Sequence, residues 1–182
     1  MNALKDFLSK NIAQIIGLSI VILIPLFFII TRTQTQPTEQ ESIQPEFTTR
    51  WGCLEHEIED SKLKLSIENT LNTTERGQGL SGREELPENQ GMMFNFARHD
   101  RQPMWMYKMK FPLDFIVLDD ELKMTDLQEN IPACEPNTQC QVFYVGPGTH
   151  VVEVNAGTIA KAVLKKDTRF RWEPGEKCAV PL

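Results

Sequence analysis

The residues best suited to bind a ligand lie in one stretch, from Glu75 to Asp114, and at one later position. Two arginines, a tryptophan and two carboxylates are the candidates: Arg76, Arg83, Trp105, Asp114 and Glu153. Arginine carries a planar fork of donors, and an indole ring can stack on a sugar face. Together these types predict a shallow pocket for a polar ligand, a sugar or a peptide. The competing interpretation is structural, with arginine–carboxylate pairs fixing loops onto a sheet and the tryptophan in the core.

Enzymatic chemistry has fewer candidates. Glycoside hydrolysis needs two carboxyl groups about 5–9.5 Å apart, and Asp114 and Glu153 are the pair available for a hydrolase acting on envelope or extracellular glycans. Ser81 lies in Gly-Leu-Ser-Gly, which is not a nucleophile elbow. No metal-site spacing links the three histidines, which are His56, His99 and His150. We therefore expect no metal and no cofactor, and favour a binding or accessory module over an enzyme.

Methionines form a second group with chemical potential. Six of the seven lie between Met92 and Met124, and thioethers bind Cu(I) outside the cytoplasm. On a strand, Met104 and Met106 would share one face. The alternative, which we prefer, is that these flexible side chains fill gaps in the core.

The clearest signal of location is the run from Ile12 to Ile30, 19 residues without a charge. About 20 such residues cross a bilayer as a helix. No small-x-small cleavage site follows, which argues against a cleaved signal peptide. Lys5 and Lys10 precede the run and only Arg32 closely follows it, so residues 1–11 are expected in the cytoplasm. The sequence predicts a single-pass protein of the cell membrane, anchored by this helix.

Residues 31–46 are rich in Thr, Gln, Pro and Glu, which predicts a flexible linker. Residues 47–182 would then form a globular domain outside the cytoplasm. Beyond residue 31 the chain holds 17 basic and 24 acidic residues, a net charge of -7. Phosphate binding needs a basic face, so this charge argues against a nucleic-acid partner.

Short apolar runs between turn signals predict a mainly β domain. Leu63, Leu65 and Ile67 alternate with polar residues, which indicates a half-buried strand. Further strands are expected at 92–96, 104–109, 115–118, 122–127, 142–145 and 151–154. The last four should form two pairs, joined at residues 119–121 and 146–148. A loop with a short helix or turns is expected at 72–86, with Thr73 or Thr74 as the cap, and a helix is expected at 156–164. The prediction is a compact antiparallel β-sandwich or barrel-like domain with one or two short helices after the transmembrane helix.

Several short motifs follow one another in a specific order and spacing: Glu75-Arg76, Gly79-Leu80, Arg83, Gly91-Met92-Met93-Phe94, Trp105-Met106, Pro112-Leu113-Asp114 and Val152-Glu153-Val154-Asn155-Ala156-Gly157. On these motifs, the chain from about Leu63 to Phe170 resembles the prokaryotic family called domain of unknown function 192. The resemblance implies a small, mainly β sandwich that is often exported or membrane-tethered, and it brings no catalytic residues. One departure is at Lys108, because the family tends to have Lys-Asn-Thr after Trp-Met.

Four cysteines all follow the apolar run: Cys53, Cys134, Cys140 and Cys178. An even number in an exported domain is typical of disulfides. Cys134 and Cys140 bracket a turn-prone loop, so we predict that they pair. Cys53 and Cys178 lie outside the region of family resemblance and would tie the two ends of the domain together. A zinc site is disfavoured because no CxxC pair occurs, and no nearby motif supports a reactive thiol.

These features predict a membrane-anchored extracytoplasmic module. Its ligand would be a polar small molecule, a glycan or a peptide, or its partner would be another envelope protein. The alternative is a carboxylate-dependent glycan hydrolase.

Overall fold

The computed structural model describes residues 47–56, 63–134, 137–175 and 177–178. The chain divides into two units, 1–40 and 41–182, and every described residue belongs to the second. The predicted N-terminus (1–11), membrane span (12–30) and linker (31–46) lie outside the described residues. Among the residues that are described, no helix is long and apolar enough to cross a membrane.

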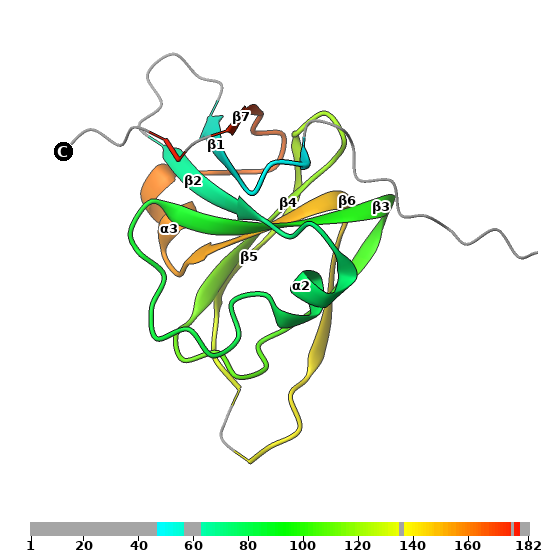
Figure 1. Ribbon diagram of the computed structural model, residues 1–182, viewed down its shortest axis with the longest axis vertical. Coiled ribbons are helices and arrows are strands. Elements are labelled where there is room, and N and C mark those ends of the chain that lie inside the picture. The colour runs from blue at the N-terminus through cyan, green and yellow to red at the C-terminus, as the bar shows by residue number, and fades with distance from the viewer. Residues whose placement is uncertain (1–46, 57–62, 135–136, 176, 179–182) are drawn as a thin grey trace, which may run out of the picture. The chain divides into compact units, whose positions relative to one another are not determined.

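The described residues form one seven-stranded sheet and two short helices (Figure 1). The strands are β1 (Trp51–His56), β2 (Lys64–Asn69), β3 (Gln90–Trp105), β4 (Leu113–Leu118), β5 (Met124–Ile131), β6 (Val142–Asn155) and β7 (Phe170–Gly175). The helices are α2 (Thr73–Gln78) and α3 (Thr158–Ala162). In space the strand order is β5-β4-β6-β3-β2-β1-β7. The prediction of a mainly β domain with one or two short helices is confirmed.

One strand pair departs from the predicted antiparallel arrangement. β2 and β3 run parallel, whereas every other neighbouring pair is antiparallel. Parallel neighbours need a crossover connection instead of a tight turn. Here the crossover is the segment between β2 and β3, which contains α2. The sheet is therefore mixed.

β3 and β6 are the two long strands, with 16 and 14 residues. The sequence predicted each as two short strands, with a turn at 146–148 in the second case. That turn was wrong, because the segment is part of β6, where Val145 and Gly148 pair with Gln102 and Asp100 of β3 across a register shift. A Cβ on Gly148 would lie 2.7 Å from the carbonyl oxygen of Leu118. A glycine here lets β6 pass close to the end of β4.

Two apolar clusters lie on opposite faces of the sheet. One contains Met93, Ile116, Val152 and Val154, and the other contains Met92, Phe94, Phe115 and Val151. Successive side chains of a strand alternate between faces, whereas directly paired residues share one. Phe115 pairs with Glu153, and Asp114 pairs with Val154. Glu153 and Asp114 therefore point to opposite faces of the sheet.

The edges of the sheet approach each other at one end. The backbone N–H of Met124 donates to the carbonyl of Thr168 at 2.7 Å, and that of Phe170 donates to Leu122 at 3.0 Å. These bonds join the segment leading into β5 to the segment leading into β7. They satisfy backbone groups that a bare edge would leave unpaired.

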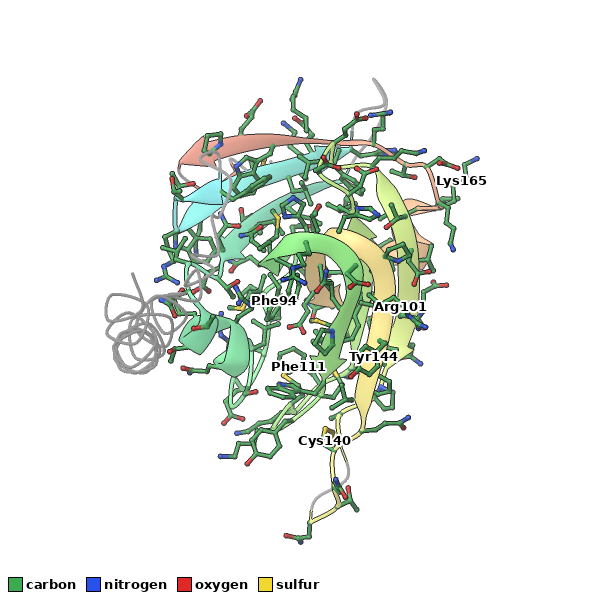
Figure 2. All side chains as sticks on the ribbon, turned by 90° about the vertical axis from the view of Figure 1, so that its right-hand side faces the viewer. Phe94, Arg101, Phe111, Cys140, Tyr144 and Lys165 are labelled. Carbon is green, nitrogen blue, oxygen red and sulfur yellow. A yellow bond between two sulfur atoms is a disulfide. The ribbon has the colours of Figure 1, made fainter. Side chains whose placement is uncertain are left out.

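Both predicted disulfides are present. Cys53 bonds to Cys178 with a Cα–Cα distance of 5.0 Å, and Cys134 bonds to Cys140 with a Cα–Cα distance of 5.6 Å. The first bridge spans 125 residues and the second spans 6. Cys140 lies just before the first residue of β6, Val142, and is seen towards the bottom of the view in Figure 2. The long bridge joins β1 to the tail after β7.

We expect removal of the long bridge to destabilise the domain more than removal of the short one. In the chain-entropy model, a bridge closing a loop of this length contributes roughly 4–5 kcal/mol to the free energy of unfolding, and one closing the short loop roughly 2 kcal/mol. Urea unfolding of the Cys53→Ala/Cys178→Ala and Cys134→Ala/Cys140→Ala double variants measures both. Equal losses of stability would contradict this expectation.

Candidate functional site

A pocket of about 430 Å³ lies between α2, the loop that follows it, and strands β3 and β6. Four aromatic rings contribute to its lining: Phe94, Phe96, Trp105 and Tyr144. Figure 2 shows Phe94 near α2, and it shows Tyr144 on β6, farther from α2 in this view. Met104 and Met109 add further apolar surface, and Arg76 and Glu153 supply the basic and acidic side chains. The pocket is thus a largely apolar hollow with few polar groups, as is usual for small-molecule sites.

Glu153 is the most unusual member of this lining. It is only 4% exposed, and its strand neighbours are Met92 of β3 and Phe115 of β4. No described residue provides its carboxyl group with a hydrogen bond or an ion pair. Burial raises the pKa of Glu153 to about 8, and the charge of Arg83 opposes that rise only in part. At neutral pH this group is mostly a neutral acid with an O–H to donate.

Arg76 lines the pocket from α2. Its Nη1 donates to the carbonyl oxygen of Asn95 at 3.1 Å, and its guanidinium lies 5.4 Å from the centre of the Phe96 ring. Both contacts join α2 to β3. They fix the guanidinium beside the aromatic wall.

The helix that forms one side of the pocket is held by capping and ion pairs. Asn72 caps it by accepting from the backbone N–H of Glu75 at 2.9 Å, one residue before the predicted cap. Glu75 accepts from the Leu71 N–H and from both terminal nitrogens of Arg50, at 2.8–2.9 Å. The Arg50 hydrogen bond, followed by that from Leu71, lowers the pKa of Glu75 to about 2. These contacts tie α2 to the segment before β1.

Arg83 takes the structural role that the sequence left as an alternative. Its Nη2 lies 2.8 Å from Oε2 of Glu68 on β2, whose other oxygen is 3.8 Å from Arg50. Arg83 is absent from the pocket lining, but its charge acts on Glu153. It is a neighbour of the site.

Trp105 and Tyr144 stand at the open side of the pocket. Their exposed fractions are 45% and 59%, so neither ring is a core residue. Trp105 pairs with Val142 and Pro103 pairs with Tyr144, which places all four side chains on one side of the sheet. The result is an exposed apolar surface that continues the pocket outwards.

Asp114 does not belong to this pocket. It is fully buried on the other face, where Oδ1 accepts from Asn130 N–H at 2.8 Å and Oδ2 from Ile159 N–H at 2.9 Å. It thereby anchors the start of α3 and the end of β5. Asp114 and Glu153 cannot flank one glycosidic bond, because their side chains leave opposite faces of the sheet.

In the part of the chain that the structure describes, the methionines and histidines considered for metal binding do not form a site either. All six methionines of the domain are buried. His150 lies on the face opposite Glu153, bonded to Asn95 at 2.8 Å, and burial lowers its pKa to about 4. Within the described ranges, no group of three or more His, Cys, Asp or Glu residues is placed to hold a metal ion.

Of the five predicted site residues, the structure brings Arg76, Trp105 and Glu153 to one pocket, places Arg83 beside it and separates Asp114 from it. Three aromatic residues of the lining were not predicted as site residues: Phe94, Phe96 and Tyr144. Alternation along β3 would have grouped Phe94 with Phe96. The position of Tyr144 in the pocket depends on the pairing of β3 with β6, and no local sequence signal predicts that pairing.

Comparison with known proteins identifies the fold and gives no activity. Residues 55–172 match the family DUF192, described as an uncharacterized ACR. A protein of Sinorhizobium meliloti 1021, provisionally named a transcription regulator, is 21% identical with a TM-score of 0.61, covering 69% of this chain and 95% of its own. A protein of unknown function from Novosphingobium aromaticivorans DSM 12444 is 21% identical with a TM-score of 0.56, covering 74% of this chain and 94% of its own. No curated protein matches the chain.

The raised pKa of Glu153 predicts a pH-dependent effect of Glu153→Gln on stability. The folded state holds this proton up to about pH 8, whereas the unfolded chain releases it near the ordinary glutamate pKa of about 4.3. The wild type therefore loses stability as pH rises through that window. Glu153→Gln lacks this loss. Between pH 4 and pH 8.5, its free energy of unfolding should therefore rise relative to that of the wild type by on the order of 1–4 kcal/mol.

Urea unfolding at several pH values measures this gain. Glu88→Gln at an exposed position is the matched control. A difference between Glu153→Gln and the wild type that stays constant with pH would contradict the assignment.

Proposed function

Because the chain belongs to the DUF192 family, whose description names no activity, we propose a function from the pocket: the domain is a binding module for a polar ligand with an apolar face, a sugar or a peptide. The single observation that carries this proposal is the Glu153 carboxyl group. It lines an aromatic pocket, nearly buried and without a hydrogen-bond partner among the described residues. A ligand that completes its hydrogen bonding would offset the cost of burying it.

Binding is favoured over catalysis by the content of the pocket. Among the residues that the structure describes, Glu153 is the one carboxylate in the lining, whereas glycoside hydrolysis needs a second carboxylate across the scissile bond. The glycan hydrolase considered from the sequence thus loses its carboxylate pair. A nucleic-acid partner is disfavoured by the acidic charge beyond residue 31. The name of the Sinorhizobium protein does not alter this, because a likeness at 21% identity concerns the fold.

We place this module outside the cytoplasm, anchored in the cell membrane by Ile12 to Ile30. The apolar run and the preceding lysines support the anchor and its orientation. The two disulfides support an oxidising compartment. An envelope protein remains a candidate partner for the exposed apolar surface beside the pocket.

The barrel-like character expected from the sequence has support at one end of the sheet. There, backbone bonds join the segments before β5 and β7, and the side chains of Leu122, Met124 and Phe170 belong to the apolar cluster on the face opposite the pocket. We propose that this closed end gives the pocket a rigid frame.

Trp105→Ala should weaken ligand binding at least tenfold, because it removes the ring at the mouth of the pocket. Tyr107→Ala is the matched control, since Tyr107 is similarly exposed, at 52%, but is absent from the lining. Saturation-transfer NMR of the full chain in detergent, against sugar and peptide libraries, identifies the ligand, and titration calorimetry gives the affinities. Equal losses in the two variants, or no ligand at all, would count against the proposal.

Protease treatment tests the orientation. With the outer permeability barrier opened, protease should remove the domain from intact cells and leave a small anchored fragment. Full protection would reverse the orientation, and an intact domain in the medium that begins near residue 32 would indicate a cleaved signal.

A further inference from the structure

Building on the proposed function, we infer that the ligand is a sugar carrying an acetamido group. Its amide carbonyl would accept a hydrogen bond from Glu153, and its ring face would lie against Trp105 and Tyr144. The inference rests on three features of the pocket: an apolar interior with one hydrogen-bonding acid, the charges that face this acid, and the exposed rings.

The interior of the pocket best fits a small ligand group that combines one hydrogen-bond acceptor with an apolar part. Phe94, Met104 and Met109 surround the inner pocket with apolar surface, and Glu153 is the acid among them. A plain sugar would place several hydroxyl groups against this surface, and each unpaired hydroxyl buried there is unfavourable. An acetamido group matches better, because its methyl group packs on apolar side chains while its carbonyl accepts from the acid.

The charges around Glu153 disfavour a cationic ligand. Arg76 on α2 lines the same pocket, and Arg83 in the following loop acts on Glu153 from beside it. Glu68 on β2 is paired with Arg83 at 2.8 Å. On β6, Tyr144 is the other ionisable group in the lining. An ammonium group would meet a neutral acid and the guanidinium of Arg76, with Arg83 beside the site, whereas a neutral carbonyl oxygen can accept from the acid or from Arg76.

The rings favour a sugar over a peptide. Trp105 and Tyr144 come from paired strands and expose large parts of their rings on one side of the sheet. A pyranose presents a flat face of C–H groups to such rings, whereas an extended peptide presents alternating side chains. The volume of about 430 Å³ lies within the range of small-molecule sites, about 300–1,000 Å³.

This arrangement predicts a pH dependence with a definite sign. The bound state needs the proton on Glu153, whose pKa in the free protein is about 8. Affinity should be nearly constant below that value and fall above it. By pH 9.5 the neutral fraction has dropped by more than tenfold, so the affinity should drop by about tenfold or more.

The test uses the full chain in detergent and calorimetric titration at pH 6 and pH 9.5. The probes are the trisaccharides of N-acetylglucosamine, of glucose and of glucosamine, with N-acetyl-alanyl-alanine as the peptide comparison. We expect the acetylated sugar to bind at least tenfold more tightly than the others at pH 6, and tenfold or more weakly at pH 9.5. Glu153→Gln, which also donates to a carbonyl, should bind it with no fall at pH 9.5. Glu153→Leu should lose it.

Glu88→Gln should follow the wild type at both pH values. Equal binding of glucose, stronger binding of glucosamine, equal binding of the peptide, or a pH response that persists in Glu153→Gln would each overturn the acetamido assignment. If another ligand binds in a Trp105-dependent way, only this assignment fails. If the ligand libraries also give no Trp105-dependent binding, the proposed function fails with it.

Discussion

The pocket depends on how one very short helix is held in place. α2 has six residues and buries none of them, so it lacks the apolar face that fixes most surface helices. Its position comes instead from the Asn72 cap and from the paired hydrogen bonds between Glu75 and Arg50. Arg76 then continues this attachment across to β3. Directional polar contacts therefore decide where this side of the pocket stands, and the sheet supplies the rest.

The same crossover that makes the sheet mixed also creates the hollow. Because β2 and β3 run parallel, the chain must return to the starting end between them, and α2 lies on that return path. The helix stands beside β3 and leaves part of that face uncovered by core side chains. Glu153 of β6 reaches this gap from the neighbouring strand. A purely antiparallel hairpin at this point would have no such connection.

Glu153 works against the stability of the domain. On the same face of β6, the preceding residue Val151 is buried and apolar. An apolar residue in place of Glu153 would avoid the cost of burying an acid. Asp114 is buried as deeply, but its two oxygens accept backbone hydrogen bonds that organise α3 and β5. The contrast separates a carboxylate whose role in the fold is visible from one that the fold leaves unsatisfied.

The sequence by itself determined the features that rest on local pattern or composition. Alternation at Leu65 and Ile67 predicted β2, and the number and placement of cysteines predicted both disulfides. The motif order predicted the family, which the match over residues 55–172 confirms. The tertiary structure alone decided what depends on strand pairing. Local turn signals at Gly146-Pro147-Gly148 predicted a hairpin, but pairing with β3 on both sides of Gly146-Pro147 keeps that segment within one strand. The separation of Asp114 from Glu153 and the arrival of Tyr144 beside Trp105 follow from register, which relates residues far apart in the chain.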